Sequence, residues 1–75
     1  MMYLRAWIVD GEVAHCHCSD LPITHDVIEV ASASFIVTAS LETEYTDAAQ
    51  ILGQLSWDGS KLSGFDFISY KVVET

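Results

Sequence analysis

The chain has 75 residues, the length of one small domain, so we expect residues 1–75 to fold as a single unit. Eleven Asp and Glu residues outnumber three Lys and Arg residues, which gives a formal net charge of −8 with neutral histidines. Because binding to phosphate backbones and to anionic membranes depends on Lys and Arg, this charge argues against direct contact with either. A hydrophobic fraction of 51% also argues against a disordered acidic tail.

The sequence carries no sign of export or membrane insertion. No basic region followed by an apolar run stands at the N-terminus, and no apolar segment approaches the roughly 18–20 residues that span a bilayer. Cys16 and Cys18 lie two residues apart, where a disulfide between them would be strained. A reduced thiol pair is typical of the cytoplasm. We therefore expect a soluble, cytoplasmic protein.

A β-hairpin is expected near the N-terminus, where "YLRAWIV" (3–9) and "VAHCHC" (13–18) flank Asp10-Gly11. Asp-Gly suits a type I′ turn, which needs positive φ at both central residues. A two-residue loop places Trp7 opposite Ala14, and cross-strand partners share one face of a sheet. This register predicts which side chains share a face. We favour Trp7, Ala14, Cys16 and Cys18 as the inward set and His15 and His17 as the outward set, and the reverse arrangement is the alternative.

Residues 27–45 alternate between apolar and polar side chains, which is the period of a strand with one buried face. The length of the pattern indicates two strands, or one long strand that bends near Ser32–Ser34. A helix over residues 24–32 is the alternative. The apolar positions of the pattern are Ala31, Ala33, Phe35, Val37, Ala39 and Leu41.

Residues 47–57, "DAAQILGQLSW", are the best helix candidate, with Thr46 as the N-cap. Ala48, Ile51, Leu52 and Leu55 recur at the spacing of one helical face. Asp58-Gly59 ends the helix or forms the following turn.

A last strand is expected over residues 65–73, "FDFISYKVV". Its alternation places Ile68, Tyr70 and Val72 on one side and Phe67, Ser69 and Lys71 on the other. The elements follow the order ββ(β)αβ. They predict an α+β fold, in which an antiparallel sheet of three to four strands carries one helix on one face as a two-layer sandwich.

The run "AHCHC" (14–18) combines residue types that bind metals. On a strand, however, alternate side chains point to opposite faces, so His15 and His17 separate from Cys16 and Cys18. The four side chains then cannot surround one tetrahedral ion. We expect no metal and no cofactor. A small metal-binding protein that uses His15, His17 and His25 is the alternative.

No catalytic motif is evident. No Gly-rich elbow surrounds a serine, and neighbouring Cys and His residues point apart on a strand. The carboxylates stand in polar contexts, without an apolar pocket that would raise a pKa. The sequence therefore predicts that the protein is not an enzyme.

Acidic side chains gather in "LETEYTD" (41–47), where Glu42 and Glu44 are expected on the solvent face of a strand and Asp47 at the start of the helix. Carboxylates two residues apart on a strand are separated by about 6.6 Å, close to the separation of successive phosphates along a nucleic-acid strand. This pattern favours a protein partner with a basic surface, to which the side chains imitate nucleic acid. Charges that merely protect a solvated strand edge are the competing interpretation.

Further partner contacts are expected from Asp26, Glu29 and Trp7. The hairpin carries large apolar side chains on both faces, whereas one helix covers only one face, so an exposed apolar strip is expected. Such strips form partner or dimer interfaces, which makes a homodimeric structural or assembly module a further alternative. The strip is either Leu4, Ile8 and Val13 or Tyr3 and Trp7.

The short length, the charge of −8, the run of Glu42, Glu44 and Asp47 and the compact mixed fold resemble small acidic inhibitor proteins from phages and mobile elements, anti-CRISPR proteins among them. The resemblance extends over the whole chain as a profile, and no motif or single residue carries it. It implies an inhibitor that binds a protein partner and blocks a nucleic-acid-binding site on CRISPR or host machinery, in the host cell cytoplasm if a phage encodes it.

Overall fold

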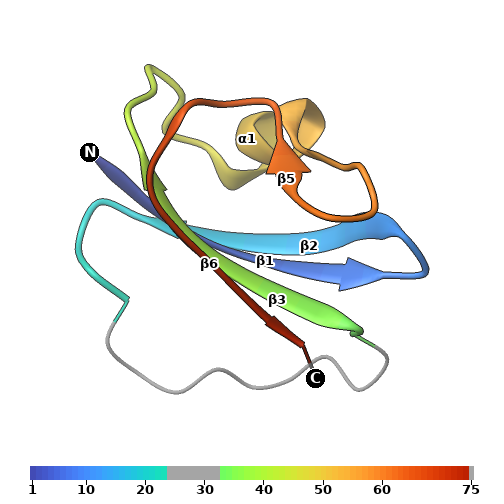
Figure 1. The fold of residues 1–75 in the computed structure, drawn as a ribbon. Helices are drawn as coiled ribbons and strands as arrows, with labels where there is room; N and C mark the ends of the chain where they lie inside the picture. The colour runs from blue at the N-terminus through green and yellow to red at the C-terminus, as the bar shows by residue number, and fades with distance from the viewer. Residues whose placement is uncertain (24–32, 75) are drawn as a thin grey trace.

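The computed structural model describes residues 1–23 and 33–74, and it contains a four-stranded antiparallel sheet with one short helix on one side (Figure 1). The predicted α+β class is confirmed, with four strands in the main sheet. A separate two-stranded ribbon was not expected. The main strands are β1 (Met2–Val9), β2 (Glu12–Ser19), β3 (Phe35–Leu41) and β6 (Phe67–Glu74), the helix is α1 (Ala48–Gln54), and the ribbon is β4 (Ser56–Trp57) with β5 (Leu62–Ser63).

The strands of the main sheet run in the order β2-β1-β3-β6, and each pair is antiparallel. The first hairpin and its Asp10-Gly11 turn are as predicted, and both turn residues have positive φ. The period-two pattern holds for β3, whereas the proposed helix over residues 24–32 lies outside the described residues. Figure 1 shows α1 and β5 on the same side of the sheet. We call this side the near face and the opposite side the far face.

The core lies between the near face and α1. The even-numbered residues of β1 point toward the helix, and Leu4, Ala6 and Ile8 are at most 1% exposed. Ile51 is the buried residue of α1 and is fully covered. Burial of apolar surface is the main favourable contribution in so small a domain. The buried cluster around these residues is completed by Cys16, Val37, Leu41, Leu55 and Leu62.

A bulge in β2 changes the predicted faces of the first hairpin. Val13 pairs with Ile8 but His15 pairs with Trp7, so Ala14 is an extra residue without an opposite partner. An extra residue reverses which face the following side chains occupy. The predicted pairing of Trp7 with Ala14 is therefore wrong, and Trp7 shares the far face with His15 instead of the near face with Cys16.

A second bulge has the same effect in β6. Ser69 pairs with Ser40 and Phe67 pairs with Leu41, which leaves Ile68 as the extra residue. Phe67 therefore lies on the near face and contacts Tyr70, with ring centroids 5.4 Å apart. The prediction that Phe67 shares a side with Ser69 and Lys71 is wrong. Ile68 is 56% exposed.

The helix is shorter than predicted. Asp47, not Thr46, is the N-cap, and its carboxylate accepts a hydrogen bond from the Ala49 amide at 2.9 Å. The helix ends at Gln54 because Leu55 already has an extended backbone and the next two residues form β4. The predicted extension to residue 57 is therefore wrong, and the amphipathic helical spacing continues into a strand.

The turn that joins β4 to β5 is built around Asp58, as the Asp58-Gly59 pair predicts. Its carboxylate accepts hydrogen bonds from the amides of Ser60 and Lys61, at 3.0 and 2.8 Å. These bonds hold the pKa of Asp58 below its ordinary value. After β5, Gly64 has a φ of +117° and passes directly beside the C-terminal end of α1.

The expected apolar strip on the hairpin is absent from the surface. Leu4, Ile8 and Trp7 are at most 5% exposed, because the helix covers the first two and Trp7 is buried on the far face. The prediction of an exposed strip there is wrong. Within the described residues, large exposed apolar side chains on a strand occur instead on β6, at Ile68, Tyr70 and Val73.

Candidate functional site

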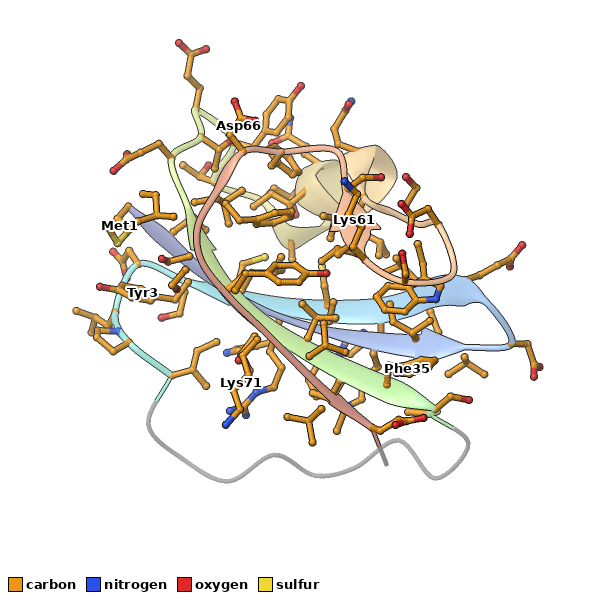
Figure 2. The ribbon with its side chains drawn as sticks, viewed as in Figure 1. Met1, Tyr3, Phe35, Lys61, Asp66 and Lys71 are labelled. Carbon is orange, nitrogen blue, oxygen red and sulfur yellow. The ribbon has the colours of Figure 1, made fainter. Side chains whose placement is uncertain are left out.

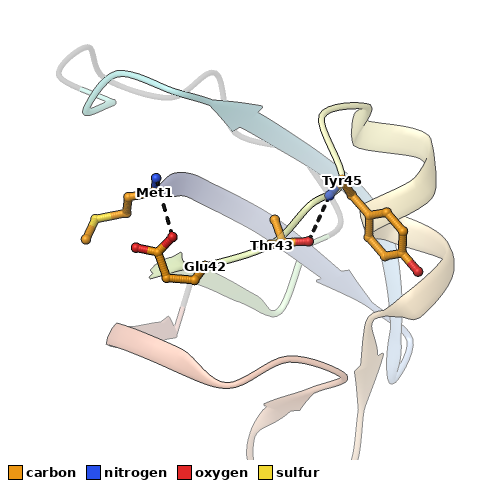
Figure 3. Close-up of polar contacts among 4 residues, drawn as sticks. All are labelled: Met1, Glu42, Thr43 and Tyr45. Carbon is orange, nitrogen blue, oxygen red and sulfur yellow. Dashed lines mark hydrogen bonds and ion pairs between the residues drawn. The ribbon is translucent and has the colours of Figure 1, made fainter.

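The predicted acidic residues lie in the connection between β3 and α1, which we call the acidic loop (residues 42–47). Because β3 ends at Leu41, Glu42 and Glu44 do not stand on a strand as expected. The Met1 ammonium approaches the Glu42 carboxylate at 3.7 Å, and the Tyr45 amide donates to the Thr43 hydroxyl at 3.1 Å (Figure 3). The separation of the two carboxylates is therefore set by a folded loop and not by the pleat of a strand.

An aromatic contact brings a second acidic segment to the acidic loop. The ring of Tyr45 meets the ring of Phe65 edge to face, with centroids 6.2 Å apart at an interplanar angle of 85°. Such a contact is worth about 0.5–1.5 kcal/mol and favours an arrangement in which the two segments lie close together. Asp66 follows Phe65, is exposed, and lies on the near-face side of the molecule (Figure 2). We call the exposed carboxylates of Glu42, Glu44, Asp47 and Asp66 the acidic end.

Sequence reasoning did not find Asp66. It stands 19 positions after Asp47, and neither residue belongs to a motif. The one sequence feature that the two acidic segments share is an aromatic residue, Tyr45 in the acidic loop and Phe65 next to Asp66. Pairing them requires the path of the chain through α1 and the small ribbon, which the sequence did not predict.

Charge is unevenly distributed over the molecule. Every carboxylate in residues 1–23 and 33–74 belongs to an exposed residue. Two of the three Lys and Arg residues, Arg5 and Lys71, stand on the far face, and Lys61 lies in the turn before β5. The acidic end therefore carries four carboxylates, and the positive groups beside it are the Met1 ammonium, 3.7 Å from Glu42, and Lys61, which lines the same pocket as Asp66.

The other predicted partner contacts are not placed with the acidic end. Asp26 and Glu29 lie outside the described residues. Trp7 is 5% exposed and its ring centroid lies 5.1 Å from that of His15 on the far face. A side chain covered to this degree offers a partner little surface, so Trp7 is not an accessible anchor in this structure.

The run "AHCHC" separates into two pairs on opposite faces, as strand alternation predicts. His15 and His17 are exposed on the far face, and Cys16 and Cys18 point toward α1. Among the residues that the structure describes, no group of three His, Cys, Asp or Glu side chains could hold a metal ion. His25 lies outside that part of the chain, so the His15, His17 and His25 set stays an untested prediction.

Both cysteine side chains contribute to the hydrophobic core: Cys16 belongs to the buried cluster and Cys18 packs against it. Cys16 is 5% exposed, and its Sγ donates to the carbonyl oxygen of Ala48 at 3.5 Å. Burial raises the pKa of the Cys16 thiol. Burial, together with the charge and the hydrogen bonding of Cys16, raises the pKa of Cys18 from 9.0 to about 12. Thiols with raised pKa values are weak nucleophiles, because the thiolate is the reactive form.

The raised pKa of Cys18 predicts a loss of stability in alkali. In the unfolded chain the thiol loses its proton near pH 9, whereas in the folded protein it keeps the proton up to about pH 12. The stabilising effect is thus complete below pH 9 and is lost as the pH rises from 9 to 12. Denaturant midpoints at about pH 8 and pH 11 should fall further for the native chain than for Cys18→Ala. Equal falls would contradict the raised pKa.

A pocket of about 280 Å³ opens on the far face, across β1, β3 and β6. Its polar side chains come from strands that are distant in sequence, so no local motif marks it. The bulge in β6 sets which side chains of that strand line it. The pocket is lined by far-face side chains of the sheet and is bordered by two residues that follow β2. The far-face side chains are Tyr3, Arg5, Thr38, Ser69 and Lys71, and the bordering residues are Pro22 and Ile23.

No protein family, curated protein or solved structure matches the chain. The fold and the site therefore define the protein only as a small acidic α+β domain. In residues 1–23 and 33–74 no helix is long and apolar enough to cross a membrane.

Proposed function

We propose that the protein is a small acidic inhibitor whose acidic end binds a basic, nucleic-acid-binding surface on a protein partner. The contact between Tyr45 and Phe65 is the observation that carries the proposal, because it holds two acidic segments side by side. Loops fixed in this way lose little conformational freedom when a partner binds.

The charge distribution supports this mode of binding. Nucleic-acid-binding surfaces are rich in Lys and Arg, and the carboxylates of the acidic end would occupy the positions of phosphates on such a surface. Arg5 and Lys71 lie on the far face, so these two side chains do not repel the partner at the contact. A net charge of −8 also steers the chain toward a basic partner and accelerates association.

Reversal of two charges tests the proposal. We expect Glu42→Lys/Glu44→Lys to weaken partner binding about tenfold or more, because reversed interfacial charges turn attraction into repulsion. The matched control is Glu12→Lys/Glu74→Lys, which changes the net charge equally at exposed positions near the other end of the sheet. The measurement is capture from a lysate of the native host at low and high salt, followed by mass spectrometry.

Binding should weaken as salt increases, and added double-stranded nucleic acid should displace the captured partner. Equal capture by the acidic-end variant and the native chain would contradict the proposal. So would equal losses in both double variants, since net charge and not the acidic end would then account for binding.

A homodimeric assembly module is the second candidate, and the exposed edge of the sheet favours it. β6 is an edge strand with Ile68, Tyr70 and Val73 each at least 40% exposed. Unpaired edge strands pair readily with a second chain. Light scattering that gives the mass of one chain at high concentration would contradict this candidate.

A further inference from the structure

We propose that the far-face pocket binds a small dianionic oxyanion of the phosphate-monoester class between Arg5 and Lys71. This site is separate from the acidic end and does not depend on the function proposed for it. The inference rests on the pairing of three strands, on the chemistry of the pocket lining and on the volume of the pocket.

The strand register places the two cations on either side of one hydroxyl. Arg5 of β1 pairs with Thr38 of β3, and Thr38 pairs with Lys71 of β6. Directly paired residues share a face, and neighbouring strands lie about 4.8 Å apart. The Cα atoms of Arg5 and Lys71 are therefore separated by about 10 Å, a span across which the two long side chains can reach one anion. Figure 2 shows Lys71 on the side of the sheet opposite α1.

A second row of hydroxyls lies beside the cations. Tyr3 pairs with Ser40, and Ser40 pairs with Ser69. The hydroxyl oxygens of Ser40 and Ser69 are 2.8 Å apart, and Ser40 is 3% exposed. When the buried Ser40 hydroxyl donates, the Ser69 hydroxyl keeps its proton for a ligand. Two cations and hydroxyl donors from three strands match the several acceptor oxygens of a phosphate group.

The surroundings favour a small ligand over a polyanion. A volume of about 280 Å³ lies just below the usual range of small-molecule sites, and Pro22 and Ile23 give the pocket an apolar border. A long phosphate backbone would extend beyond Arg5 and Lys71 over a protein of net charge −8. Far-face cations therefore attract one compact anion and not a nucleic-acid strand.

The test is a titration of the full chain with inorganic phosphate, followed by amide NMR at constant ionic strength. We expect saturable shifts at Thr38, Ser69 and Lys71, and an affinity about tenfold or more lower in Lys71→Gln, which loses one charge-assisted contact. Lys61→Gln is the matched control, because it removes the same charge from a lysine in the β4–β5 turn and should leave the affinity unchanged. Lys71 is exposed, so its substitution leaves the core intact.

Three results would overturn the inference. One is the absence of saturable shifts with phosphate. Another is equal loss in Lys71→Gln and Lys61→Gln, which would indicate a response to net charge. The third is equal affinity for acetate or chloride, since a site built for a dianion must prefer phosphate to a monoanion. None of these measurements involves the acidic end, so failure here leaves the inhibitor proposal standing.

Discussion

Replacing Gly64 with alanine should lower the free energy of unfolding by about 3 kcal/mol or more, the largest effect we expect from adding one methyl group. The φ of +117° at Gly64 is one that residues with a Cβ rarely adopt. A Cβ would also collide with the carbonyl oxygen of Gln54 and lie 2.9 Å from its carbonyl carbon. These atoms are backbone at the C-terminal end of α1, so they cannot move aside as a flexible side chain would.

Substitutions at two other glycines distinguish the cost of backbone strain at Gly64 from the cost of the collision with Gln54. Gly59 has a φ of +98° but no atom within 4 Å of the position that an added methyl group would take, so Gly59→Ala measures backbone strain alone, about 1–3 kcal/mol. Gly53 lies inside α1 with open space around it, so Gly53→Ala should stabilise the protein by about 0.5–1 kcal/mol. Guanidinium unfolding of the three variants gives the comparison. A Gly64→Ala loss no larger than that of Gly59→Ala would contradict the collision.

The second large effect is expected from Ile51→Ala. Ile51 is fully buried and is the buried residue of α1, so it is the main attachment of the helix to the near face. Removing the side chain costs the lost burial and leaves a cavity, about 2–5 kcal/mol in total. A domain of this length has a total stability of about 4–11 kcal/mol. Loss of this one side chain therefore removes a large part of the margin that keeps the chain folded.

The control for Ile51→Ala is the preceding residue. Gln50 is exposed in the same helix, so Gln50→Ala should change the free energy of unfolding by less than about 0.5 kcal/mol. Far-ultraviolet circular dichroism against guanidinium concentration measures both variants. If Ile51→Ala costs no more than Gln50→Ala, the helix does not depend on this contact, and the fold is held by the sheet alone.

Most of the secondary structure could be predicted because it depends on short-range signals. The Asp10-Gly11 turn, the alternation in β3 and the hydrophobic face of α1 each lie within a few residues. The β4–β5 ribbon was missed because Leu55 continues the apolar spacing of α1. Only the preference of Asp58-Gly59 for a turn indicated that the helix had ended.

The faces of β2 and β6 could not be predicted, because each strand contains a bulge. Ala14 and Ile68 are the extra residues, and neither is a glycine or another residue that marks a bulge. Both faces of the first hairpin carry apolar side chains, so the hydrophobic pattern did not reveal the shift. A hairpin without the bulge would place Arg5 opposite Cys16, whereas Arg5 pairs with His17 and lines the far-face pocket.

The candidate sites depend on pairings that span the chain. The acidic loop was found from composition, but its partner Asp66 required the contact between Tyr45 and Phe65. Arg5 and Lys71 stand 66 positions apart and meet only through Thr38 in the register of three strands. Composition thus indicated what the surface contains, and only tertiary structure showed which charges lie together.

Because β2 contains the bulge at Ala14, the number of residues in the strand, more than their identity, determines which side chains face the core. Point mutations along the strand change one side chain and leave the assignment of faces intact. Insertion of one residue after Ala14 would shift the rest of the strand by one position and exchange imidazoles with thiols between surface and interior, whereas loss of Ala14 would remove the bulge and keep both sets in place. Among descendants of this gene, we expect substitutions within residues 12–18 to accumulate while insertions are eliminated, because an insertion reverses the faces of all the residues that follow it.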